Sequence, residues 1–194
     1  MGMEGSSTMG VGPSAAEARF TQLYARFYSP IRAYCNRRVV SEAGDDVVAE
    51  VFLTMWRRID EVPDGDAALV WLYGVAYRVI GHQWRSVTRR SRLRSRLQSA
   101  ETLPVVGADD SGRDDVDLRR VLAALARLNA TDAEVLRLDA WEQLSAVSIA
   151  AVLEIEPDAA RQRLHRARRH LAREYDVLLS RPTSTSVAPL GGAQ

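Results

Sequence analysis

The chain of 194 residues contains no lysine, a single cysteine and no long hydrophobic run. One cysteine, Cys35, excludes an internal disulfide and any metal site built from several cysteines, and its place among apolar residues predicts a packing role. No stretch approaches the roughly 18 consecutive apolar residues that a membrane-spanning helix needs. The N-terminus has neither the basic start nor the apolar run of a secretory signal. These absences predict a cytoplasmic protein that does not insert into membranes.

Arginine supplies all of the positive charge. The chain has 26 basic and 25 acidic residues and a formal net charge of +1, but two segments, 85–96 and 161–173, each hold six arginines and no acid. A guanidinium group binds phosphate through two parallel hydrogen bonds and stacks on bases, so each cluster indicates nucleic-acid binding. The alternatives are a solvated helix face, or a preference for arginine over lysine across a whole genome.

Apolar residues recur every three or four positions through most of the chain, without sustained alternation. This spacing predicts an all-α fold. In the first half we expect helices over residues 16–39, 45 or 46–59, and 69–85 or beyond. Pro30 should kink or break the first helix, and Gly44 and Pro63 should bracket the second. The apolar stripe expected along the first helix comprises Phe20, Leu23, Tyr24, Phe27, Ile31 and Tyr34.

In the second half we expect helices over residues 116–128, 131–140, 145–153 and 157–179. Thr131 and Glu134 have the spacing of a capping box, and Ser145 is suited to cap the helix that follows it. Pro157 fits the first position of the last helix. The last two helices, joined by a tight turn, predict a helix-turn-helix. Its second helix carries an arginine cluster and suits a DNA major groove.

These elements predict two small helical domains joined by a flexible acidic linker, the second domain being the helix-turn-helix. Between residues 109 and 117 there are five aspartates and one arginine, a composition typical of an exposed linker. The expected divisions are a disordered N-terminus (1–15), a first domain (16–97), the linker (98–115), a second domain (116–180) and a disordered tail (181–194).

The third helix carries a second stripe, formed by Tyr73, Tyr77, Ile80 and Trp84, beside arginines at positions 78 and 85. Aromatic rings stack on unpaired bases while arginines hold the backbone, so this face suits single-stranded DNA. The alternative is that these rings pack against the first helix.

The order of these features resembles that of the extracytoplasmic-function (ECF) sigma factors, over about residues 20–175. The segments that carry the resemblance are 46–56 (DVVAEVFLTMW), 71–76 (WLYGVA) followed by Arg78 and Arg85, 128–141, 149–153 (IAAVL) and 161–168 (RQRLHRAR). The resemblance implies a sigma factor that binds core RNA polymerase, directs promoter-specific transcription initiation and helps to melt the promoter. The first domain then corresponds to sigma region 2 and the second to sigma region 4.

The resemblance also implies roles for individual residues. Recognition of the minus-thirty-five element is expected from Arg161, Gln162, Arg163, Arg166 and Arg168. Recognition and melting of the minus-ten element is expected from Trp71, Tyr77, Arg78, Trp84, Arg85 and Arg89. Docking on the clamp helices of the largest polymerase subunit is expected from Asp46, Glu50, Phe52 and Trp56. The implied partners are core RNA polymerase, through its clamp helices and flap, promoter DNA and an anti-sigma factor, and no catalytic residue, cofactor or metal is implied.

The turn before the last helix departs from the family pattern. Glu154 and Glu156 stand where the family often has glycine and then serine or threonine. A glutamate is a weaker helix cap, and it brings negative charge close to the expected phosphate contacts. A sigma-like protein that binds polymerase but no longer initiates transcription is therefore one further interpretation.

Two other protein classes fit the sequence less well. A helix-turn-helix regulator that does not bind polymerase would need a ligand or dimerisation domain in the first half of the chain, where an aromatic and arginine face lies instead. An enzyme is disfavoured because His82, His165 and His170 are scattered and no glycine-rich phosphate loop is present.

Overall fold

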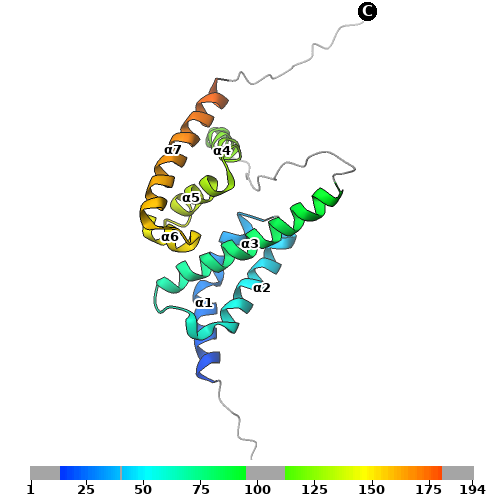
Figure 1. Cartoon of the computed structure of the whole chain (residues 1–194), viewed down its shortest axis with the longest axis vertical. Helices are drawn as coiled ribbons and strands as arrows, with labels where there is room; N and C mark the ends of the chain where they lie inside the picture. Colours follow the sequence, from blue (N-terminus) through cyan, green and yellow to red (C-terminus); the bar gives the residue numbers. More distant parts are fainter. Residues whose placement is uncertain (1–13, 40, 95–111, 181–194) are drawn as a thin grey trace, which may run out of the picture. The chain divides into compact units, whose positions relative to one another are not determined.

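The computed structural model describes residues 14–39, 41–94 and 112–180, without the side chains of residues 41–43, 84–94 and 112–115. All regular elements in these ranges are helices, so the predicted all-α class is confirmed. The chain divides into two compact units, one built on the three N-terminal α-helices and the other on the four C-terminal ones (Figure 1). Residues 1–13 and 181–194 and most of the expected linker lie outside the described residues. None of the described helices is long and apolar enough to cross a membrane.

The first unit comprises α1 (Ala15–Asn36), α2 (Ser41–Arg57), the 3-10 helix η1 (Ile59–Glu61) and α3 (Ala67–Arg94). Its core lies where the three α-helices meet, and its largest fully buried side chains are Ile31, Tyr34, Met55 and Leu72. The ring centroids of Tyr34 on α1 and Tyr73 on α3 lie 5.0 Å apart, an attractive aromatic contact. This contact fixes which face of α3 is turned away from the core.

Pro30 lies inside α1, and the break that was one expectation for this position is absent. A proline inside a helix removes one backbone hydrogen bond and costs about 3 kcal/mol or more. Phe27, Ile31 and Tyr34 surround it in sequence and are at most 3% exposed. Burying each such side chain stabilises the fold by roughly 1.5–3 kcal/mol, so tertiary packing outweighs the local cost.

The expectation that Gly44 precedes the second helix was wrong, because α2 begins at Ser41 and contains Gly44. A Cβ atom built on Gly44 would lie 2.6 Å from Oδ1 of Asn36, the last residue of α1. Gly44 is buried inside α2, where it packs against the Asn36 side chain, and it does not mark a helix boundary. The third helix is also longer than the expected minimum, since α3 extends to Arg94.

Cys35 is completely buried in the first unit, in agreement with the predicted packing role. Burial raises the pKa of its thiol to about 12, and the positive charge of Arg38 offsets only part of that effect. The thiolate, which is the reactive form of cysteine, is therefore suppressed in the folded protein at neutral pH.

This burial predicts a loss of stability at alkaline pH. An unfolded Cys35 releases its proton near pH 9 while the folded form keeps it to about pH 12, so its contribution to stability is present below pH 9 and decreases above it. The expected slope is about 1.4 kcal/mol per pH unit. Urea denaturation of the wild type and of Cys35→Ala at several pH values isolates this contribution, since other alkaline titrations are common to both proteins. If the free energies of unfolding of the two proteins changed with pH in parallel, the contribution of Cys35 would be contradicted.

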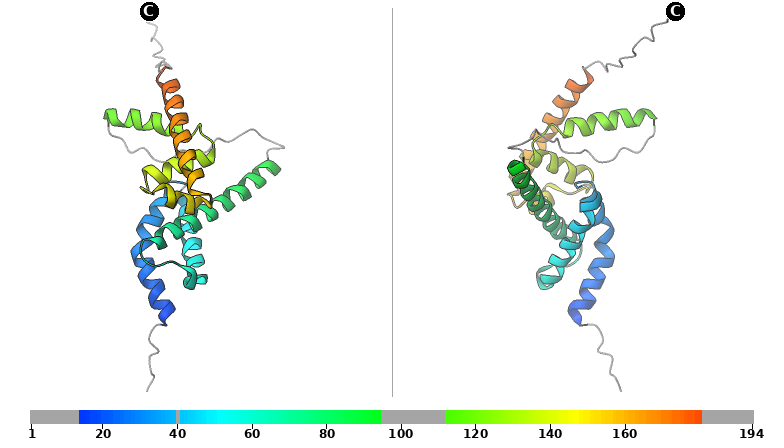
Figure 2. Two further views of the ribbon diagram at one scale, coloured as in Figure 1. Left: turned by 60° about the vertical axis from the view of Figure 1, so that its left-hand side comes forward. Right: turned by 90° about the vertical axis from the view of Figure 1, so that its right-hand side faces the viewer.

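The second unit comprises α4 (Gly112–Leu125), α5 (Ala130–Ala140), residues 146–150 of α6 (Ala146–Leu153) and α7 (Pro157–Leu179). Both α4 and α5 pack against α7, and Figure 2 shows α4 lying across it. The core between them contains Leu125, Ala133, Leu136 and Ala167, with Leu128, Leu164 and Leu171 packed against it. The bounds predicted for the last helix are confirmed.

The helix expected over residues 116–128 begins earlier, because α4 starts at Gly112. Several of the aspartates assigned to the linker therefore lie in the first turns of this helix, where negative charge is favoured by the helix dipole. Asp117 also accepts hydrogen bonds from Arg120 at 3.1 Å and from the Tyr175 hydroxyl of α7 at 3.4 Å.

The predicted capping box at Thr131 and Glu134 was also wrong. The N-cap of α5 is Asn129, whose Oδ1 accepts the backbone N–H of Asp132 at 2.9 Å. Its Nδ2 donates to Asp132 Oδ2 at 2.8 Å. Asparagine is a better N-cap than threonine, and the same spacing two residues earlier therefore starts the helix. The cap predicted for α6 is confirmed, since Ser145 Oγ accepts the N–H of Ser148.

The turn between α6 and α7 is closed by a backbone bond from Ile155 N–H to the Ala150 carbonyl, 3.0 Å long, as in a Schellman motif. Glu154 takes the left-handed position in this turn, with a φ of 55°. Glu156 is the N-cap of α7 and makes no capping bond with its side chain, and Pro157 occupies the first helical turn. The sequence expectation of a weak cap is confirmed.

Replacing Glu154 by glycine is expected to stabilise the folded protein by up to about 1 kcal/mol, because a side chain in the left-handed region costs about 1–2 kcal/mol and glycine loses more chain entropy on folding. Thermal denaturation followed by circular dichroism should show a melting temperature higher by a few degrees. Glu154→Ala removes the same charge but keeps the Cβ, and it should give no such gain. Equal stabilisation by both variants would show that charge, not backbone strain, is responsible.

Candidate functional site

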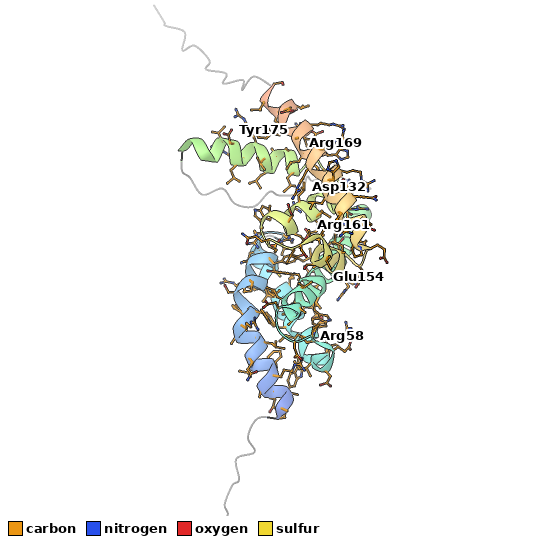
Figure 3. The ribbon with its side chains drawn as sticks, turned by 90° about the vertical axis from the view of Figure 1, so that its left-hand side faces the viewer. Arg58, Asp132, Glu154, Arg161, Arg169 and Tyr175 are labelled. Carbon is orange, nitrogen blue, oxygen red and sulfur yellow. The ribbon has the colours of Figure 1, made fainter. Side chains whose placement is uncertain are left out.

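The outer face of α7 gathers four side chains into one open surface. Arg161, Gln162, His165 and Arg166 line a shallow hollow of about 400 Å³. Their spacing places them on adjoining rows of the helix, opposite the buried Ala160 and Ala167. Arg161 and Arg169, the latter also exposed, are labelled in Figure 3. This face presents positive charge together with donors and acceptors that fit base edges.

Three of these four residues were predicted from the sequence, and His165 was not. In the sequence it stands out only as one of three scattered histidines, which disfavour an enzyme. Its position four residues after Arg161, on the same face, was the signal that could have identified it. In the described part of the chain, no group of three or more histidine, cysteine, aspartate or glutamate residues could hold a metal ion.

Two other predicted DNA contacts, Arg163 and Arg168, are turned towards α5. Arg163 Nη1 lies 3.7 Å from Asp132 Oδ1, and Arg168 Nη2 donates to Asp139 Oδ2 at 2.8 Å. Asp132 also has its Oδ2 3.6 Å from His170 Nδ1, and it lies beside α7 in Figure 3. The arginine cluster is therefore divided between an open face and a face paired with carboxylates.

Arg161 is paired as well, but in a different setting. It donates to Asp158 one turn earlier on the same helix, and the two side chains are 57% and 80% exposed. A pair so open to solvent is worth little, typically below about 1 kcal/mol. Arg161 can exchange this partner for a DNA phosphate or base at small cost.

On α3, the structure separates the residues of the second stripe. Tyr73 is buried and its ring contacts Tyr34, so the alternative that the rings pack against the first helix holds for Tyr73. Ile80 is buried as well. Tyr77 is half-buried and Arg78 is exposed. The side chains of Trp84, Arg85 and Arg89 lie outside the described residues.

Trp71, near the start of α3, has a charged neighbour over its ring. The guanidinium carbon of Arg58 lies 5.5 Å from the ring centroid. Arg58 in turn donates two hydrogen bonds to the Glu61 carboxylate, at 3.1 and 2.5 Å. These bonds raise the pKa of Arg58 and lower the pKa of Glu61. Glu61 therefore holds Arg58 in the position from which it covers one face of the Trp71 indole.

The outer face of α2 exposes Asp46 and Glu50 and also two large apolar side chains, Leu53 and Trp56, each 41% exposed. Phe52, predicted to contact polymerase, is only 4% exposed and supports this face from inside.

Aromatic side chains of α1 extend this face. The Trp56 ring meets Phe20 edge-on at 5.3 Å, and Tyr24 lies 4.7 Å from Phe52 between ring centroids. Tyr24, expected in the core stripe of the first helix, is 40% exposed. The first unit therefore carries an apolar and aromatic surface, which we call the α1–α2 face and define by Phe20, Tyr24, Leu53 and Trp56.

Comparison with known proteins agrees with this division into two helical units. Sigma-70 region 2 matches residues 23–90, and Sigma-70 region 4 matches residues 118–171. The ECF RNA polymerase sigma factor SigL of Mycobacterium tuberculosis is 30% identical over 163 residues, which cover 82% of this chain and 91% of SigL. The chain belongs to the ECF RNA polymerase sigma factor family.

A second relative of this sigma factor is the RNA polymerase sigma factor CnrH of Cupriavidus metallidurans, 27% identical over 84% of this chain and 90% of CnrH. Among solved structures, the complex of the sigma factor RpoE with the anti-sigma factor NepR from Bartonella quintana matches with a TM-score of 0.65 and 21% identity. It covers 81% of this chain and 97% of the matched chain, which supports the shared fold.

The family determines the activity at a general level. This sigma factor binds core RNA polymerase and promoter DNA and directs promoter-specific transcription initiation. Sigma factors are not catalytic in the usual sense. The surfaces on α2, α3 and α7 are the candidates for this binding.

Proposed function

We propose that this sigma factor divides promoter recognition between its two units. The outer face of α7 reads the minus-thirty-five element in duplex DNA, and the exposed side of α3 reads and melts the minus-ten element. The α1–α2 face docks on the clamp helices of the largest polymerase subunit, while the second unit contacts the flap.

The observation that carries this proposal is the hollow lined by Arg161, Gln162, His165 and Arg166. Arginine pairs with guanine and glutamine with adenine through two hydrogen bonds each in the major groove. His165 adds a ring whose two nitrogens can donate or accept. A helix-turn-helix presents such residues from its second helix, which is the position of α7.

For the minus-ten element, Trp71 and Tyr77 supply rings and Arg78 supplies a positive charge on the same helix. With Arg58 over one face of the Trp71 indole, the indole is restrained and is ready to stack on a base with its remaining surface. The proposal also assigns Trp84, Arg85 and Arg89 to this surface, and for these three residues it rests on the sequence alone.

The surface proposed to bind polymerase has an apolar centre, the exposed ring of Trp56, and charged neighbours, the exposed carboxylates of Asp46 and Glu50. Exposed tryptophans with such surroundings often dominate binding energy at protein interfaces. Phe52 acts in the proposal as a positioning residue beneath this surface.

The proposal places the protein in the cytoplasm, where core polymerase and the chromosome are found. It also includes an anti-sigma factor as a regulatory partner. This partner is supported by the solved complex of a sigma factor of the same fold with an anti-sigma factor.

Reconstitution with bacterial core RNA polymerase tests the proposal. The holoenzyme should produce discrete run-off transcripts from a pool of genomic promoter fragments, and the start sites should share upstream motifs at the spacing of two recognition elements. Binding to polymerase without discrete transcripts would contradict promoter reading by α3 and α7. Transcripts whose promoters share a downstream motif alone would contradict the role of α7.

A further inference from the structure

The arginine cluster of α7 contains two classes of side chain that the sequence does not distinguish. Arg161 and Arg166 lie on the open face, and their neighbours there are Gln162 and His165. Arg163 and Arg168 contact the carboxylates of Asp132 and Asp139 on α5, which we call the acidic pair.

The geometry of the two helices explains how Arg163 and Arg168 reach α5. The buried stripe of α7 comprises Ala160, Leu164, Ala167 and Leu171. At 100° per residue, Arg163 and Arg168 lie about 70° to either side of the centre of this stripe. Their side chains therefore start beside the helix that covers the stripe, and α5 places a carboxylate within reach of each.

The acidic pair is itself held in place. Asp132 and Asp139 are two helical turns apart on α5, about 10.5 Å along its axis. The Asp132 side chain is 11% exposed, accepts a hydrogen bond from Nδ2 of the N-cap residue Asn129, and has its oxygens 3.7 Å from Arg163 and 3.6 Å from His170. The Asp139 side chain is 27% exposed, and its bond to Arg168 measures 2.8 Å. The carboxylates of these two pairs are therefore shielded from solvent more than Asp158, which is 80% exposed, although the Arg168 side chain is itself 59% exposed.

We propose that the acidic pair restricts which arginines of α7 bind DNA. Asp132 and Asp139 hold Arg163 and Arg168 against the fold, so that these two side chains are withheld from the phosphate backbone. Phosphate contacts give affinity without sequence information, whereas base contacts give specificity. The acidic pair thus acts as a positioning element that favours sequence reading by Arg161 and Arg166. The inference rests on the proposed role of α7 in DNA binding.

Asp139 gives the sharper test, because its partner Arg168 is 59% exposed and can reach solvent once released. The full chain would be titrated against a duplex of random sequence, and binding would be followed by fluorescence anisotropy at several salt concentrations. Each additional phosphate contact changes the slope of log K against log salt by about 0.9. Asp139→Asn should therefore steepen the slope by about one. For each protein, the affinity at about 50 mM salt is divided by the affinity at about 200 mM salt. This ratio should be about 3.5 times larger for Asp139→Asn than for the wild type.

A double-mutant cycle separates release of Arg168 from a general change in charge. In an Arg168→Ala background, Asp139→Asn should leave the salt slope unchanged. Asp139→Glu retains the carboxylate and should behave like the wild type. Asp176→Asn changes the charge by the same amount on α7 itself, at an exposed residue, and should also leave the slope unchanged.

If Asp139→Asn steepened the salt slope equally with and without Arg168, the inference would be overturned. An unchanged salt slope in the single variant Asp139→Asn would overturn it as well. The same titration with Arg161→Ala and Arg166→Ala combined tests the underlying function. If that variant weakens binding while Asp139→Asn has no effect, the role of α7 stands and the role of the acidic pair fails. If neither variant changes binding, both fail.

Discussion

Replacing Arg161 and Arg166 together by alanine is expected to reduce the affinity of the holoenzyme for its promoter at least thirtyfold. Each good contact between an arginine and a base contributes about 1–3 kcal/mol of discrimination, so the two together contribute about 2–6 kcal/mol. The loss should be largest on promoters with an intact upstream element. Competition binding with promoter fragments that carry or lack this element measures it.

A matched control for this variant is available on the same helix. Replacing Arg163 and Arg168 by alanine removes the same charge, but from side chains that contact α5. This control should change promoter affinity only a few-fold. Circular dichroism melting would confirm that both double variants are folded under the assay conditions. Equal losses for the two variants would mean that total charge, and not the open face, determines binding.

Replacing Trp56 by alanine is expected to weaken the binding of core RNA polymerase by about 2–4 kcal/mol, or roughly 30- to 800-fold. The side chain is 41% exposed, and its main ring contact within the fold is the edge-on contact with Phe20 at 5.3 Å. Such a contact is worth about 0.5–1.5 kcal/mol, so the folding stability of the first unit should fall much less than the polymerase affinity. Fluorescence titration of labelled protein with core polymerase measures the affinity.

His82→Ala provides the control for this experiment. His82 is an exposed ring on α3, outside the α1–α2 face. Its removal should leave polymerase affinity unchanged in the absence of DNA. An unchanged affinity in the Trp56 variant would contradict docking through the α1–α2 face.

The sequence predicts the helices of the second unit well where local signals and packing agree. Pro157 fixes the start of α7, and the buried residues Ala160 and Ala167 follow at helical spacing. The sequence-based predictions fail where the same residue type fits two different positions in a helix. Gly44 fits a helix boundary, but here it lies inside α2 against the Asn36 side chain, a contact that arises only when the two helices are packed.

Tertiary contacts account for what the sequence leaves open at the binding surfaces. The periodicity of α1 places Tyr24 on the same side as Ile31, yet Tyr24 is exposed, because the core covers only part of the helix. Helical spacing also divides the arginines of α7 into rows. It does not reveal that Asp132 and Asp139 oppose two of them, since these carboxylates belong to another helix.

The ion pairs between α5 and α7 have a consequence for how this sigma factor searches a chromosome. A guanidinium group that is already neutralised by a carboxylate displaces no counterions when the protein meets DNA. With two such groups, the second unit gains less free energy at each of the roughly 10⁶–10⁹ competing sites of a genome. The holoenzyme then stays for a shorter time at each non-specific site, and a larger share of it is free to bind another site.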